Sequence, residues 1–125
     1  MRDRLIAAVL SGRKTASSSL LADWQREGEP LPVAGQHRVV INSAERPVAI
    51  IEIVEVEVIA LGDADLRLAI EEGEGFASVA QWREAHERFW SGSSGDSVEG
   101  VGAPALSDQT RIVVERFELV RRLST

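Results

Sequence analysis

The sequence predicts an α+β fold, a small β-barrel with helices packed around it, in one domain spanning residues 1–125. Segments rich in valine and isoleucine indicate strands at 36–42, 47–61 and 111–120. Short helical patterns lie between these strands, and the last strand comes late in the chain. Because 44% of the residues are hydrophobic, there is enough apolar material for one core. This order of elements favours a barrel with helices on one side.

Two helices are expected near the start of the chain. The first covers 2–10, because its apolar residues form one stripe and Gly12 stands where a left-handed C-terminal cap belongs. The second covers 20–27, with Ser18 or Ser19 as its N-cap.

Helices are also expected between the second and third predicted strands. Asp63 is predicted to cap a helix that runs through 69–72. Ser78 and Gln81 have the spacing of a capping box, which predicts the start of another helix. Glycine and serine dominate 91–108, so this segment is predicted to be a mobile loop.

Composition excludes several classes of function. Without cysteine the chain has no disulfide, thiol nucleophile or zinc–thiolate site, and its two histidines are too isolated for a metal cluster. We therefore expect neither a metal nor a cofactor. The longest apolar run, 48–61, is interrupted by three glutamates, and no segment has the pattern of a signal peptide. These features predict a cytoplasmic protein without membrane contact, and a net charge of −6 argues against nonspecific binding of long nucleic acid.

Lys14 is the only lysine among 14 basic residues. Arginine serves wherever only charge is needed, so a lone lysine indicates a group that must be compact or must lose its proton. It lies in the polar segment 12–19, Gly-Arg-Lys-Thr-Ala-Ser-Ser-Ser, which lacks the glycine pattern of a phosphate-binding loop. The alternative is that one lysine survived by chance in a solvated capping turn.

Glutamates supply two further candidate features. Glu52 falls on the apolar row of the long predicted strand, where it would need Lys14 or an arginine as partner. The alternative is that the strand register is shifted by one residue, which turns Glu52 outward. Glu72 and Glu74 belong to an acidic stretch at a helix end, where negative charge opposes the macrodipole. Such a placement indicates a function, although most acidic runs are solvated surface.

Aromatic residues at helical spacing are usually part of a core. We therefore expect Trp82 and Phe89 to be buried, whereas Trp24 and Trp90 could also stack on a base. His86, one turn after Trp82, is expected to be a packed or surface histidine and not a catalyst.

The sequence resembles the ASCH family. The resemblance rests on Gly-Arg-Lys-Thr at 12–15 with a hydroxyl at Ser17, Ile-Glu-Ile at 51–53, and the acidic-glycine stretch 69–78. It continues through Trp82 and His86 to the closing strand, Val-Val-Glu-Arg-Phe at 113–117, and so covers nearly the whole chain.

This resemblance implies a PUA-like barrel whose cleft binds a nucleoside or single-stranded RNA. One bacterial branch of the family consists of N4-acetylcytidine amidohydrolases, which use a lysine, a hydroxyl three residues later and a glutamate after the second helix. These roles fall on Lys14, Ser17 and either Glu72 or Glu74. Two departures are a serine where the amidohydrolases have threonine, and Ser19 where many members have arginine. A ribonuclease activity assigned to another member depends partly on a tyrosine, which this chain lacks.

Together these features predict amide hydrolysis of an N4-acylated cytidine. Ser17 attacks the acyl carbonyl, Lys14 carries the proton, and Glu72 or Glu74 orients the lysine or activates water. Other side chains expected to contact the substrate or to support the pocket are Arg13, Thr15, Ser18, Trp24 and Glu52. The alternative is a non-catalytic module that binds RNA or a nucleotide, with cations on phosphate and an aromatic ring on a base.

Overall fold

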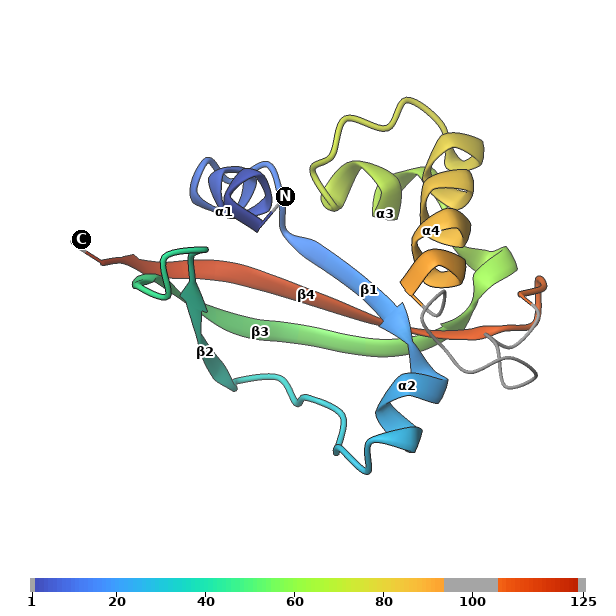
Figure 1. Ribbon diagram of the computed structural model, residues 1–125, viewed down its shortest axis with the longest axis horizontal. Helices are drawn as coiled ribbons and strands as arrows, with labels where there is room; N and C mark the ends of the chain where they lie inside the picture. Colours follow the sequence, from blue (N-terminus) through green and yellow to red (C-terminus); the bar gives the residue numbers. More distant parts are fainter. Residues whose placement is uncertain (1, 94–105, 124–125) are drawn as a thin grey trace.

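The computed structural model describes residues 2–93 and 106–123. Its elements are α1 (Arg2–Leu10), β1 (Ala16–Leu20), α2 (Leu21–Arg26), β2 (His37–Ile41), β3 (Pro47–Ala60), α3 (Leu66–Glu71), α4 (Val79–Ser93) and β4 (Arg111–Arg122). A 3-10 turn, η1 (Leu61–Asp63), joins β3 to α3. In the view of Figure 1, α1, α3 and α4 are drawn above the long strands, and α2 lies below them. No helix in these described ranges is long and apolar enough to cross a bilayer.

The four strands form one antiparallel sheet in the order β1-β4-β3-β2. The sheet curls into a half-barrel, with the long strands β3 and β4 side by side at its centre (Figure 1). Register shifts interrupt the β3–β4 ladder between Ile50 and Ile51 and between Ile53 and Glu55. Such irregularities raise the local twist and bend the strand that carries them. The predicted α+β class is confirmed.

Hydrophobic residues pack into two cores. One core joins α3 and α4 to the sheet, with Trp82 at its centre and Trp90, Leu68 and Ile112 around it. The other is built from Val9, Ile51, Ile53 and Phe117. Because successive strand residues alternate in direction, Ile112 and Phe117 point to opposite faces of β4. The sheet is therefore covered by apolar contacts on both faces.

The second half of the polar segment 12–19 is part of a strand, β1, which was not predicted from the sequence. β1 pairs with β4 from Ala16 opposite Arg116 to Leu20 opposite Ile112. Ser18 and Ser19 therefore do not cap α2, whose N-cap is Leu20 without a side-chain hydrogen bond. The sequence Ala-Ser-Ser-Ser-Leu has little strand propensity of its own, so pairing with the apolar strand β4 decides its conformation.

Helix caps differ from the prediction in detail. The cap of α3 is Asp65 and not Asp63, because its Oδ1 accepts a hydrogen bond from the amide of Leu68 at 3.0 Å. At α4 the Ser78 hydroxyl accepts from the Gln81 amide at 3.2 Å, as expected for a capping box. The predicted loop 91–108 begins later than expected, since α4 continues to Ser93, and 94–105 lie outside the described residues.

Glu52 does not face the core. The strand register is therefore the alternative one, shifted by one residue so that Glu52 points outward. Its neighbours Ile51 and Ile53 are buried, whereas Glu52 is 40% exposed at its side chain and lies 3.3 Å from His37 across the β2–β3 pair. Its partner is therefore neither Lys14 nor an arginine.

The turn after α3 lies directly on the chain around Lys14. The amide of Thr15 donates to the carbonyl of Glu71 at 2.7 Å, and the amide of Lys14 donates to the carbonyl of Ala8 at 3.0 Å. A Cβ atom at Gly73 would lie 2.7 Å from the carbonyl oxygen of Arg13 and 2.8 Å from the Cα of Lys14. Gly73 also has a φ of +72°, which side chains rarely adopt. Only glycine allows this approach.

Replacing Gly73 by alanine tests the importance of this contact. We expect Gly73→Ala to lower the free energy of unfolding by at least about 2 kcal/mol, because it adds backbone strain and a steric clash. Gly75→Ala is the matched control, since Gly75 has a φ of +83° but nothing within 4 Å of its Cβ position. Urea denaturation of both variants measures the difference. Equal losses would show that the close approach at Gly73 contributes nothing.

Candidate functional site

Lys14 is buried at the junction of α1, β1 and the turn after α3. Its side chain is only 8% exposed. The ammonium Nζ donates to the carbonyl oxygen of Ala16 at 2.9 Å and to that of Glu72 at 3.2 Å. An ammonium group has three protons, and two of them are donated to backbone carbonyls.

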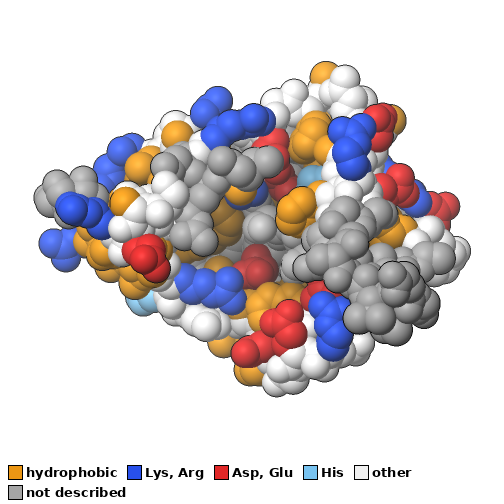
Figure 2. All heavy atoms as spheres, viewed as in Figure 1, with side chains coloured by type: hydrophobic (Ala, Val, Ile, Leu, Met, Phe, Trp, Pro, Cys, Tyr) orange, Lys and Arg blue, Asp and Glu red, His pale blue; other side chains and the backbone are white. Residues whose placement is uncertain are grey.

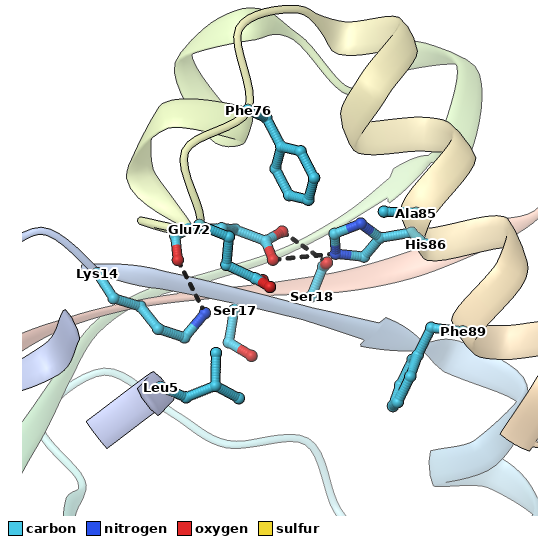
Figure 3. Close-up of a pocket in the computed structure, with 10 residues that line it drawn as sticks. Leu5, Lys14, Ser17, Ser18, Glu72, Phe76, Ala85, His86 and Phe89 are labelled. Atoms are coloured by element: carbon cyan, nitrogen blue, oxygen red, sulfur yellow. Dashed lines mark hydrogen bonds and ion pairs between the residues drawn. The ribbon is translucent and has the colours of Figure 1, made fainter. Parts of the chain in front are cut away.

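The carboxylate of Glu72 is held by three donors. Its Oε2 accepts from the Ser18 hydroxyl at 2.7 Å and from the indole Nε1 of Trp82 at 2.9 Å, and its Oε1 lies 3.0 Å from Nε2 of His86. Glu72 is only 2% exposed, so these bonds replace its hydration. In Figure 3 the side chains of Ser18 and His86 converge on this carboxylate, whereas Lys14 reaches the backbone of the same residue.

His86 is protonated on both ring nitrogens in this arrangement. Its Nδ1 lies 2.8 Å from the carbonyl oxygen of Trp82, one turn earlier in α4, and its Nε2 faces Glu72. Carbonyl and ionised carboxylate oxygens can only accept, so each nitrogen must donate. The ring also stacks on the indole of Trp82, with centroids 4.2 Å apart. His86 and Glu72 therefore form a buried ion pair.

The pKa shifts of the two groups agree with this assignment. Burial by itself would raise the pKa of Glu72, but the hydrogen bond and charge of His86, together with the bonds from Ser18 and Trp82, lower it overall. Burial by itself would lower the pKa of His86, but the hydrogen bond and charge of Glu72 outweigh it and raise the pKa. Each charge stabilises the other.

A cavity of about 300 Å³ opens beside this network. It is lined by Leu5, Lys14, Ser17, Ser18, Glu72, Glu74, Phe76, Ala85, His86 and Phe89. Figure 3 shows Phe76 and Phe89 on opposite sides of the polar groups, with Leu5 of α1 next to Lys14 and Ser17. The cavity is thus mostly apolar, with a few polar groups gathered in one region, which is typical of a small-molecule site.

The structure brings the four predicted catalytic residues, Lys14, Ser17, Glu72 and Glu74, together in this cavity with Ser18. The other predicted residues lie elsewhere. Arg13 is exposed and lines a separate cavity of about 160 Å³, with its Nε 3.1 Å from the Ser11 hydroxyl. Thr15 is held in the backbone between α3 and β4, Trp24 donates to the Ser19 hydroxyl at 2.8 Å, and Glu52 pairs with His37.

Two residues of this cavity were not expected to belong to a site. His86 was predicted to be packed or on the surface, and it is the charged partner of Glu72. Phe89 was predicted to be in the core, and this was wrong, because it is 64% exposed and lines the cavity. Trp82 and Trp90 face the core, whereas Phe89, the neighbour of Trp90, points out of it, because adjacent helical residues lie about 100° apart.

Three of these groups could offer ligand atoms to a cation. One oxygen or nitrogen each of Glu72, Glu74 and His86 lie within 4.8 Å of one another. In the arrangement described above, a proton on Nε2 of His86 lies between the imidazole and Glu72. A metal would have to displace it, so the present geometry is that of an ion pair. The expectation that no metal binds stays a prediction.

The sequence and structure were compared with known proteins. A family model described as the ASCH domain matches residues 1–121. This chain belongs to the ASCH domain family. Its relatives with known structures include an ASCH domain from Lactobacillus crispatus, 32% identical with a TM-score of 0.79, over 94% of this chain and 70% of that one. A protein from Enterococcus faecalis is 30% identical with a TM-score of 0.81, over 95% and 68% of the two chains.

A mutant of the ASCH protein of Zymomonas mobilis is similar in fold alone. It is 13% identical with a TM-score of 0.55, over 97% of this ASCH domain and 69% of that chain. No curated protein matches the sequence. These relatives establish the PUA-like α+β fold, and the residues of the cavity must supply the argument for function.

The Glu72–His86 ion pair predicts a pH-dependent stability. The folded-state pKa of His86 is raised above its unfolded value of about 6.5, so its contribution is complete below that pH and is lost as the pH rises through the folded pKa. The pKa of Glu72 is lowered, so its contribution is present above about pH 4.3 and is lost as the pH falls through the folded pKa.

We therefore expect His86→Gln to destabilise the protein more at about pH 6 than at about pH 9, as measured by urea denaturation. His37→Gln is the control, because His37 is exposed and should change the unfolding free energy by less than about 0.5 kcal/mol. A loss of stability in His86→Gln that is the same at both pH values would contradict the ion pair.

Proposed function

We propose that this ASCH domain hydrolyses the N4-acyl amide of a cytidine-type nucleoside, free or within single-stranded RNA. The observation that carries the proposal is the burial of the only lysine in a cavity shared with a serine hydroxyl and two glutamates. These groups can supply a nucleophile, a proton carrier and an activator of water. The resemblance of Lys14, Ser17 and the 72–74 region to N4-acetylcytidine amidohydrolases indicates the substrate class.

In the proposed reaction the Ser17 Oγ attacks the acyl carbon while neutral Lys14 accepts the hydroxyl proton. The bond between the acyl carbon and N4 then breaks, and Lys14 gives the proton to N4, which leaves as the amino group of cytidine. A water molecule next attacks the acyl-serine ester and gives a proton to Lys14. Lys14 passes it to the Ser17 oxygen, and the acyl group departs as a carboxylic acid.

The surroundings of Lys14 support its use as a proton carrier. Among the described residues no carboxylate is in ion-pair contact with Nζ, although Glu72 and Glu74 line the same cavity. A carboxylate in direct contact would hold the ammonium in its charged form. Glu72 contacts Lys14 through its carbonyl instead, because its carboxylate is occupied by Ser18, Trp82 and His86. The two acids therefore line the same cavity as Lys14 without forming an ion pair with it in the described part of the chain.

The two glutamates are suited to different roles. Three donors occupy the carboxylate of Glu72, so we assign it to positioning: it fixes Ser18 and, through its carbonyl, Lys14. Glu74 is only partly buried, lines the cavity and forms no hydrogen bond within the described ranges. A free carboxylate at the cavity wall is placed to orient the water that hydrolyses the acyl-serine, while Lys14 accepts the proton of that water.

One observation favours a binding module without catalysis. Lys14 donates to two backbone carbonyls, and within the described part of the chain no hydrogen bond joins it to Ser17. A charged, tethered ammonium could hold a phosphate or a base carbonyl without taking part in a reaction. The two functions differ in what Lys14 must do, because binding needs only its charge and hydrolysis needs a proton that can leave.

The direct test is incubation of the protein with N4-acetylcytidine while the release of cytidine is measured by chromatography. We expect release by the natural chain, a loss of at least roughly a hundredfold in Lys14→Arg, and a larger loss in Ser17→Ala. Ser18→Ala should retain more activity than Ser17→Ala, because the Ser18 hydroxyl donates to Glu72 and is not the proposed nucleophile. Absence of release, together with cytidine binding that survives in Lys14→Arg, would establish the binding module instead.

The assignment of the glutamates gives a separate prediction. Glu72→Gln should lower both stability and activity, because the protonated His86 loses its counter-charge in a buried site. Glu74→Gln should leave stability unchanged within about 0.5 kcal/mol and should lower the rate of deacylation. Glu84→Gln is the control for both, as Glu84 is exposed on α4 and pairs only with Arg88. Acyl-enzyme that fails to accumulate in Glu74→Gln, as seen by mass spectrometry, would assign the water-activating role to another group.

A further inference from the structure

A second ion pair, between a buried glutamate and a partly exposed arginine, lies on the side of the sheet to which Ser17 points. Glu115 of β4 is 8% exposed, and its Oε2 lies 2.8 Å from a guanidinium nitrogen of Arg38 on β2. The sheet order places β3 between these strands, so the arginine side chain reaches over one strand to make the contact. A buried ion pair is weak evidence for a role in stability, because desolvation offsets most of the attraction. Its position next to Ser17 indicates a role in binding.

Strand register places Ser17 directly opposite Glu115. The two residues are Cα partners in the β1–β4 ladder. Side chains of directly opposed residues lie on the same face of a sheet, with Cβ atoms about 5 Å apart. Arg38 shares this face, since it is opposite Ile51, which belongs to the same core as Phe117. We call this surface the Glu115 face; it is defined by Ser17, Ser19, Arg38, Val113, Glu115 and Phe117.

Ser17 and Ser18 therefore connect two polar networks. Ser18 points to the opposite face and donates to Glu72, whereas Ser17 lines the Lys14 cavity and shares its face with Glu115. A ligand whose reactive carbon lies at Ser17 would extend toward Lys14 on one side and toward Glu115 on the other. Figure 2 shows a hollow near the middle of the molecule, with acidic and basic side chains next to one another inside it and at its rim.

Glu115 retains an acceptor for a ligand. Its Oε2 is paired with Arg38, whereas Oε1 accepts no hydrogen bond from the described residues. Every fully buried side-chain oxygen or nitrogen in the described ranges has a partner, so Oε1 is reachable from outside. Burial raises the pKa of Glu115 above its usual value, although Arg38 acts in the other direction. The carboxylate is thus poorly hydrated, and a ligand N–H would supply the donor that its Oε1 lacks among the described residues.

The hydrogen-bonding groups of Glu115 and Arg38 are complementary to those of cytosine. Cytosine offers a donor at N4 and acceptors at N3 and O2, side by side on its Watson–Crick edge. Uracil reverses the pattern at the first two positions, with an acceptor at O4 and a donor at N3. A carboxylate next to a guanidinium offers an acceptor next to donors, which matches cytosine and opposes uracil.

We propose that Glu115 and Arg38 read the cytosine base, with Glu115 accepting from N4–H and Arg38 donating to N3 or O2. The proposal rests on the substrate class of the proposed function, and it adds the residues that determine specificity. An N4-acyl group keeps one N4–H, so the same contact is possible in the acylated substrate. Because the acyl carbon is bonded to N4, a base held at Glu115 brings that carbon toward Ser17, the neighbour across the strands.

Trp24 is placed to contribute to the same surface. Its indole donates to the hydroxyl of Ser19, which is opposite Val113 and therefore lies on the Glu115 face, two residues along β1 from Ser17. Trp24 is only partly buried, so part of its ring is open to a ligand. Base stacking on an aromatic ring is a common part of nucleoside recognition, and the ring also provides a fluorescence signal for binding.

The test compares the binding of cytidine and uridine by titration calorimetry, with tryptophan fluorescence as a second readout. We expect the natural chain to bind cytidine at least roughly fivefold more tightly than uridine. Glu115→Gln should bring the two affinities close together, because the amide can present a donor or an acceptor. Arg38→Lys should also reduce the preference for cytidine, since it removes the planar pair of donors. Because Arg38 is partly exposed, this variant is expected to fold even where Glu115→Gln does not.

Glu57→Gln is the matched control. Glu57 also pairs with an arginine, Arg116, at 2.8 Å, but it lies opposite Val114 and so on the other face of the sheet. It should leave the ratio of cytidine to uridine affinity unchanged. The inference is overturned if the natural chain shows no preference for cytidine, or if Glu115→Gln and Arg38→Lys both retain the preference.

This outcome is separate from that of the hydrolysis assay. Cytidine preference that depends on Glu115, without any release from N4-acetylcytidine, would overturn the proposed hydrolysis and support the base-reading pair. Hydrolysis that is equally selective in Glu115→Gln would overturn the base-reading pair alone.

Discussion

The arrangement of the site depends on how closely the turn after α3 approaches the chain before β1. At Gly73 there is no room for a side chain, since its Cβ would lie 2.7 Å from the Arg13 carbonyl oxygen. The hydrogen bond from the Thr15 amide to Glu71 holds the same two segments together. These contacts place the backbone of Glu72 within reach of the Lys14 ammonium. A wider separation would remove one of the two carbonyl acceptors of a buried ammonium and leave only that of Ala16, which is unfavourable.

Glu72 contacts Lys14 and His86 through two different groups. Its carbonyl accepts from Lys14, and its carboxylate balances the charge of His86. The charged groups are thereby kept apart. Glu72 and His86 pair with each other, and Lys14 is bound by two backbone carbonyls. Such an arrangement leaves the Lys14 side chain lining the cavity without a side-chain partner among the described residues. The imidazole of His86 is packed against the indoles of Trp82 and Trp90, which fix its position beside Glu72.

The edge strand β1 connects this network to the Glu115 face. Consecutive residues of a strand point to opposite faces, so Ser17 and Ser18 take part in different networks although they are neighbours. The Ser18 hydroxyl donates to Glu72, whereas Ser17 lines the cavity. A short polar strand at the edge of a sheet can carry two functional hydroxyls in this way only because β4 supplies the apolar contacts that hold it in place.

The sequence by itself determined the long apolar strands and the helices α1 and α4, and it singled out Lys14 as a candidate site residue. Valine and isoleucine runs and helical spacing are local signals, and a lone lysine among arginines is visible without a fold. The tertiary structure decided that the serine segment is a strand, that Phe89 is exposed, and that His86 is the partner of Glu72. It also distinguished the buried Glu72 from the more exposed Glu74. The physical reason is that these properties depend on contacts between residues distant in the chain, which neither propensity nor periodicity records.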